Sequence, residues 1–148
     1  MPATHQTTHS HSIRIPSAGV ALSGDLVLVG EDAPLVLFAH GSGSSRHSPR
    51  NQRVARRLNQ AGLSTLLFDL LTPQEEEVDA RTRQHRFDIE LLAGRMVDAS
   101  HWASAREDVG AVPLGYFGAS TGSAAALNAA ARMGGGGQGV VSRGGRAG

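Results

Sequence analysis

Short apolar runs alternate with amphipathic stretches along this chain, and the pattern predicts strands and helices in turn. Residues 34–39 and 63–71 are nearly all apolar, which is typical of strands buried on both faces of a parallel sheet. Other stretches alternate apolar and polar positions, with a bend or bulge expected at Gly24-Asp25. The predicted strands are residues 12–16, 20–30, 34–39, 63–71, 112–117 and 139–142.

Helical segments are predicted between several of these strands, over residues 49–61, 81–105 and 123–133. Ser48-Pro49 has the pattern of an N-cap followed by proline in the first turn, with Val54, Leu58 and Ala61 on one face and Gly62 placed to end the helix. In the second helix, residues such as Phe87, Leu91 and Trp102 are expected to face inward, and the acidic residues 74–79 before it to form a solvated loop. Strands alternating with helices indicate an α/β fold, a mostly parallel sheet flanked by helices.

The length of 148 residues suits one domain. We expect residues 1–11, which are polar and rich in histidine, to form a disordered tail, and residues 12–148 to form the α/β domain, glycine-rich from 134. The start lacks the apolar segment of a secretory signal, and no apolar run approaches the roughly 18 residues of a membrane span. We therefore expect a cytoplasmic protein.

Composition removes several kinds of chemistry. The chain has no cysteine, and its 14 basic residues are all arginine. Thiol catalysis, cysteine zinc sites and lysine Schiff bases are thereby excluded. The net charge of +1 gives no reason to expect nucleic acid or a membrane as a partner. No histidine spacing matches a metal site, and we expect neither a metal nor a cofactor.

The five residues Gly118-Ala119-Ser120-Thr121-Gly122 form a Gly-x-Ser-x-Gly motif between a predicted strand and a predicted helix. A serine on so sharp a turn needs small neighbours on both sides, and this context is that of a nucleophile elbow. The other interpretation is a tight glycine turn in a Rossmann-like domain. We expect Ser120 to be a catalytic nucleophile.

The loop His40-Gly41-Ser42-Gly43 follows an earlier buried strand, at the sheet edge where ligands gather in α/β proteins. The backbone N–H groups of Ser42 and Thr121 would form an oxyanion hole there. A dinucleotide-binding loop would need a third glycine where the chain has Arg46. An anion-binding module using Gly41 is a weaker alternative.

Four stretches together resemble the dienelactone-hydrolase-like branch of the α/β-hydrolases: LVLFAHGSGSSRHSPRN, LLFDLLTPQEE, RFDIELLAGRM and GYFGASTGSAAAL. The resemblance runs from about Ala33 to Arg146. It implies an eight-stranded, mostly parallel sheet, Ser120 as nucleophile, and Ser42 and Thr121 as oxyanion donors. It also implies a small-molecule substrate, a carboxylic ester or a lactone, that is cleaved without a cofactor.

A serine nucleophile needs a base and an orienting acid, yet no Asp, Glu or His follows Ser120. The resemblance places both groups beyond Gly148, so that the hydrolase fold would be short by about its C-terminal third. The chain could be a truncated form, or a short form whose open sheet edge is completed by a second copy or another polypeptide. Alternatively an internal histidine serves.

The internal candidates for the base are His40 and His47, because their loop borders the elbow if the two strands are neighbours. Asp69, at the end of another strand, could orient His40. The stronger interpretations are that His40 shapes the loop, that His47 faces solvent and that Asp69 caps the next segment.

Arg46, Arg50 and Arg53 follow the same loop. Arg46 or Arg50 could bind an acidic substrate group, although a solvated helix face is the commoner role of such residues. The sequence thus favours a serine ester hydrolase. A non-catalytic or partner-binding α/β module that lacks its base is the alternative.

Overall fold

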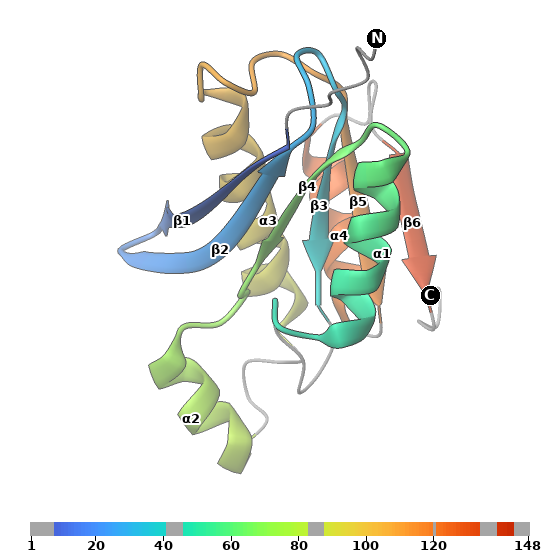
Figure 1. Cartoon of the computed structure of the whole chain (residues 1–148). Coiled ribbons are helices and arrows are strands. Elements are labelled where there is room, and N and C mark those ends of the chain that lie inside the picture. Colours follow the sequence, from blue (N-terminus) through green and yellow to red (C-terminus); the bar gives the residue numbers. More distant parts are fainter. Residues whose placement is uncertain (1–7, 41–45, 83–87, 120, 134–138, 144–148) are drawn as a thin grey trace, which may run out of the picture.

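One sheet with the strand order β1-β2-β4-β3-β5-β6 runs through the part of the chain that the computed structural model describes, residues 8–40, 46–82, 88–119, 121–133 and 139–143 (Figure 1). The strands are β1 (His9–Ser17), β2 (Val20–Leu28), β3 (Leu35–Ala39), β4 (Ser64–Phe68), β5 (Leu114–Ala119) and β6 (Gly139–Arg143). Strands β4, β3, β5 and β6 pair in parallel, whereas β1 and β2 form an antiparallel hairpin. Strand β2 in turn pairs antiparallel with β4. The predicted α/β fold with a mostly parallel sheet is confirmed.

The sheet is covered on both faces, as its apolar strands require. Helix α1 (Pro49–Gln60) lies over one face, and α3 (Ile89–Ser104) and α4 (Thr121–Arg132) lie over the other (Figure 1). Along β3, Leu35 and Leu37 belong to the core beneath α3 and α4, while Val36 and Phe38 pack in the core beneath α1. Successive side chains of a strand point to opposite faces, so a strand covered on both sides must be apolar throughout. None of the described helices is long and apolar enough to cross a membrane.

Helix α1 has the ends that its sequence predicts. The Ser48 side chain accepts a hydrogen bond from the Asn51 N–H at 3.4 Å, and proline stands in the first turn. Gly62 adopts a φ of +91°, the left-handed conformation in which glycine commonly ends a helix. Val54 and Leu58 face the sheet as expected, but Ala61 is exposed, because it lies just past the last turn.

The prediction of a loop over residues 74–79 is wrong, because α2 (Pro73–Thr82) occupies this stretch. Thr72 begins it as a capping box: its hydroxyl accepts from the Glu75 N–H at 3.2 Å, and the Glu75 carboxylate accepts from the Thr72 N–H at 2.8 Å. The helix stands beyond the carboxyl ends of the parallel strands, away from both layers (Figure 1). Its position explains why it lacks an apolar stripe.

The long helix predicted over residues 81–105 begins later than expected. Asp88 caps α3 by accepting a hydrogen bond from the Leu91 N–H at 3.0 Å, and Arg81 belongs to α2. Leu91 and Trp102 pack against the core as predicted. Phe87 lies outside the described residues.

Two predictions about the N-terminal strands are corrected. Strand β1 begins at His9, so residues 9–11, assigned to the tail, pair with β2 instead. No bulge interrupts β2 at Gly24, which pairs in continuous register with Ile13 on one side and Phe68 on the other. A Cβ atom at Gly24 would lie 2.8 Å from the Phe68 Cβ, so the glycine reflects close packing between strands.

Candidate active site

Three candidate residues follow neighbouring strands at one edge of the sheet. Strands β4, β3 and β5 end at Phe68, Ala39 and Ala119, directly before Asp69, His40 and Ser120. In β3 and β5, Ala39 pairs with Gly118, so the expected neighbourhood of the His40 strand and the Ser120 strand is confirmed. Ser120 itself and the segment 41–45, which holds Ser42, lie outside the described residues.

The junction between β5 and α4 has the spacing of a nucleophile elbow. Strand β5 ends at Ala119 and helix α4 begins at Thr121, which leaves one residue of the sequence, Ser120, between them. The first backbone N–H groups of a helix have no partner within the helix, and they carry partial positive charge. The Thr121 backbone therefore stands where a developing oxyanion could be stabilised.

His40 is buried and has an internal hydrogen-bond partner. Its Nε2 accepts a hydrogen bond from the Leu70 backbone N–H at 2.9 Å. An accepting Nε2 carries no proton, so the neutral ring bears its proton on Nδ1. This geometry favours the structural interpretation of His40 over that of a base acting through Nε2.

Asp69 is bound by Arg46 and not held ready for a histidine. The Arg46 backbone N–H donates to the Asp69 carboxylate at 2.9 Å, and the Arg46 guanidinium forms a short ion pair with the other carboxylate oxygen. The Arg46 Nε also lies 3.3 Å from the Asp25 carboxylate on β2. Ion pairs with two carboxylates hold the guanidinium in place, so the structure favours an internal role for Arg46 over substrate binding.

Other candidates lie on the surface at the start of α1. His47 is exposed beside the N-cap, and Arg50 and Arg53 are exposed on successive turns of the helix. Exposure agrees with the solvent-facing interpretation of His47. It also leaves Arg50 as a cation near the carboxyl edge of the sheet.

A buried ion pair that the sequence patterns did not reveal lies beside this edge. Arg95 of α3 is only 6% exposed, and its two terminal nitrogens donate to the two carboxylate oxygens of Glu75 at 2.5 and 2.8 Å. The Arg95 Nη1 also donates to the Leu70 carbonyl at 2.8 Å. The hydrogen bonds from Arg95 lower the pKa of Glu75 to about 2, against the opposing effect of burial. Thr-x-x-Glu at residues 72–75 was the signal that could have revealed Glu75.

We expect this pair to make folding sensitive to acid. The pKa of Glu75 falls from 4.5 to about 2 on folding, so its contribution is complete above pH 4.5 and is lost as the pH falls toward 2. The shift corresponds to at most about 3 kcal/mol, which solvent screening reduces to about 2 kcal/mol. Urea unfolding of Glu75→Gln and the parent should differ by that amount at pH 6 and converge near pH 2.

The exposed Glu77 on the same helix provides the control. The Glu77→Gln variant should stay within about 0.5 kcal/mol of the parent at pH 6, because a substitution on the exposed surface changes stability little. A gap between parent and Glu75→Gln that stayed constant from pH 6 to pH 2 would contradict the assignment.

Solved structures show what this chain resembles. A crystal structure of a dienelactone hydrolase from Anabaena variabilis is 54% identical to this chain, with a TM-score of 0.90 over 96% of this chain. The chain is therefore similar to a dienelactone hydrolase, and it shares the α/β-hydrolase fold. It spans 65% of the length of the Anabaena hydrolase.

A more distant solved structure and a curated protein are also similar to this chain. A cold-adapted esterase from an Arctic intertidal metagenomic library shares the fold at 18% identity, with a TM-score of 0.67 over 84% of this chain and 56% of the esterase. A Mycobacterium tuberculosis protein named "putative phosphoribosyl transferase" is 51% identical over 134 residues, which are 90% of this chain and 29% of that protein. Less than a third of that relative thus corresponds to this hydrolase-like chain. No protein-family model matches the chain.

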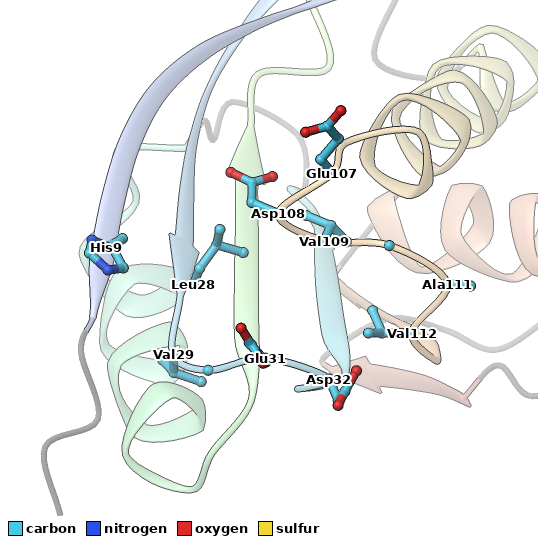
Figure 2. Close-up of a pocket in the computed structure, with 12 residues that line it drawn as sticks. His9, Leu28, Val29, Glu31, Asp32, Glu107, Asp108, Val109, Ala111 and Val112 are labelled. Carbon is cyan, nitrogen blue, oxygen red and sulfur yellow. The ribbon is translucent and has the colours of Figure 1, made fainter.

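A pocket of about 1000 Å³ lies at the opposite edge of the sheet, between residues 28–32 and 107–112, with His9 at its side (Figure 2). These two loops precede β3 and β5, at the amino ends of the parallel strands. Its acidic side chains are Glu31, Asp32, Glu107 and Asp108. Ligands of α/β sheets bind outside the carboxyl ends of the strands, so the elbow edge is the candidate active site.

Proposed function

We propose that this chain is the nucleophile-bearing part of a serine hydrolase that cleaves small carboxylic esters or lactones. The observation that carries the proposal is the single residue, Ser120, between β5 and α4, at the strand end beside β3. In a nucleophile elbow, a serine projects from a sharp turn at the sheet edge where substrates bind. The 54% identity to a dienelactone hydrolase supports the same reaction class.

The proposed reaction proceeds in two steps. The Ser120 hydroxyl attacks the ester carbonyl, its proton passes to a base, and the alcohol leaves with that proton as the acyl-enzyme forms. Water then releases the acid and frees the serine. The backbone N–H groups of Ser42 and Thr121 stabilise the oxyanion in both steps. None of these steps requires a cofactor.

We propose that the base and its orienting acid are not His40 and Asp69. The Nε2 of His40 accepts from Leu70, and the Asp69 carboxylate is bound by Arg46, so neither group is poised to activate Ser120. The family resemblance implies that a histidine and an acid fill these two roles. Activity measurements are made on the intact protein.

Pre-steady-state kinetics with p-nitrophenyl acetate test the proposal. An acyl-enzyme predicts a burst of about one equivalent of nitrophenolate per protein molecule before steady turnover. Turnover without a burst would point either to direct attack by water or to rapid deacylation. A trimethylacetate ester distinguishes the two, because its acyl group is released slowly and a burst would then appear if an acyl-enzyme forms. An intact protein without any turnover would favour the non-catalytic module.

The charge of the substrate is tested at Arg50, which is exposed in the first turn of α1. We expect Arg50→Gln to lower kcat/KM about fivefold for an ester with a free carboxylate, because an exposed charge pair contributes roughly 1 kcal/mol. The neutral ester should be unaffected. Arg53→Gln is the matched control, since it removes the same charge one turn further from the edge. Equal losses on both esters would rule out an anion-binding role.

A further inference from the structure

Asp69 and Leu70, which follow β4, bind both described ends of the stretch between β3 and α1. At its beginning, the His40 Nε2 accepts from the Leu70 N–H at 2.9 Å. At its end, the Arg46 N–H donates to the Asp69 carboxylate at 2.9 Å, and the Arg46 side chain binds the same carboxylate. Any shift of residues 69–70 would therefore move both His40 and Arg46.

Arg95 fixes that dipeptide from the other side. The Arg95 Nη1 donates to the Leu70 carbonyl at 2.8 Å, while the Leu70 N–H donates to the His40 Nε2. The remaining contacts of the guanidinium go to Glu75, in the first turn of α2. A buried guanidinium is strongly destabilising unless its donors are paired, so the three acceptors hold it in one place. Leu70 is completely buried, which keeps water from replacing either contact.

We propose that Arg95 is a positioning residue for the esterase reaction: through the Leu70 peptide it sets the His40 ring and the start of the segment that carries Ser42. The inference rests on the proposed function. Among the described residues Arg95 donates to Leu70 and Glu75, and it acts on the site through Leu70 and His40. A displacement of about 1 Å at an oxyanion donor lowers the rate roughly a hundredfold, so a relay of this kind affects turnover more than binding.

The alternative is that Arg95 only docks α2 onto the body. The two roles differ in what they predict for Leu70 and for kcat. A docking role leaves the Leu70 amide protected by His40 and leaves the reaction unchanged. A positioning role predicts that both change together when Arg95 is replaced.

The test compares Arg95→Met, Arg95→Lys and a matched control in the intact protein. The control is Arg106→Gln, because Arg106 also donates two hydrogen bonds to one carboxylate, that of Asp108, at the opposite edge of the sheet. Amide hydrogen exchange at Leu70, the ¹⁵N shifts of the His40 ring, and kcat and KM for p-nitrophenyl acetate are measured on each.

For Arg95→Met we expect at least tenfold faster exchange at Leu70, a changed His40 signal, and a kcat lowered 10- to 100-fold with KM within twofold. Core amides such as that of Leu37 should stay protected, which shows that the variant is folded. Arg95→Lys keeps the charge but has no fork, so it should recover part of the loss. Should Arg95→Met fail to fold, Arg95→Lys carries the comparison alone. Arg106→Gln should leave all three readouts unchanged.

A folded Arg95→Met or Arg95→Lys variant with parental kcat overturns the inference, whatever happens at Leu70. So does a lowered kcat with unchanged exchange at Leu70 and an unchanged His40 signal, because the relay would then be absent. If the parent cleaves no ester, the proposed function fails and the catalytic role of Arg95 fails with it. In that case the exchange and His40 measurements still decide whether Arg95 holds the Leu70 peptide.

Discussion

Replacing Ser120 by alanine should lower kcat/KM for p-nitrophenyl acetate by about a thousandfold or more in the intact protein. The serine oxygen forms the covalent bond to the acyl group, so no other interaction compensates for its loss. What activity remains would come from substrate binding and the oxyanion donors, which still stabilise attack by water. Initial rates at several ester concentrations give the value.

Ser123→Ala is the matched control, because it removes a hydroxyl from the same helix one turn after the elbow. It should leave kcat/KM within about twofold of the parent. If Ser120→Ala retained most of the activity, Ser120 would not be the nucleophile and the proposed acyl-enzyme would be wrong.

Replacing Gly24 by alanine should lower the free energy of unfolding by about 2–3 kcal/mol. The new Cβ would lie 2.8 Å from the Phe68 Cβ and 3.0 Å from both the Ile13 Cδ1 and the Leu67 carbonyl oxygen. Two of these atoms belong to the fixed part of β4, so the strands must separate to accept the methyl group. Urea denaturation followed by circular dichroism measures the change.

Gly30→Ala serves as the control, because a Cβ at Gly30 meets nothing within 4 Å. Its effect should be within about 0.5 kcal/mol of zero. A Gly24→Ala protein as stable as the parent would mean that β2 and β4 are less closely packed than the structure indicates.

The sheet was predictable because strands that are buried on both faces appear in the sequence as continuous apolar runs. The apolar runs at 34–39 and 63–71 correspond to β3 and β4, whose side chains alternate between the two cores. Helix α1 was equally predictable, since Ser48 and Pro49 begin it and Gly62 ends it through contacts and conformations within the segment itself. Local signals of this kind do not depend on the rest of the fold.

Helix α2 was not predicted because charged contacts dock it in place of an apolar stripe. Its first turn is attached to the body through Glu75 and Arg95, and its polar composition is that of a loop. Hydrophobic periodicity reports the burial of apolar side chains, so it does not detect a helix that is held by charged contacts. The capping box at Thr72 was the available local evidence.

The candidate site was predictable in its order and not in its contacts. The family motifs place Ser120, His40 and Asp69 after neighbouring strands, which the strand order confirms. The partners of these side chains depend on register across the sheet edge: Asp69 meets Arg46, and His40 meets Leu70, 30 residues away. No spacing in the sequence predicts these two contacts.

Covalent labelling of the intact protein with a fluorophosphonate, followed by peptide mass spectrometry, tests directly whether Ser120 is an activated nucleophile. Such reagents react with a serine only when a neighbouring base activates it. We predict one equivalent of adduct, located by fragmentation on Ser120 and absent from Ser120→Ala. A protein that takes up no label, or that carries it on another residue, would show that Ser120 is not the activated nucleophile.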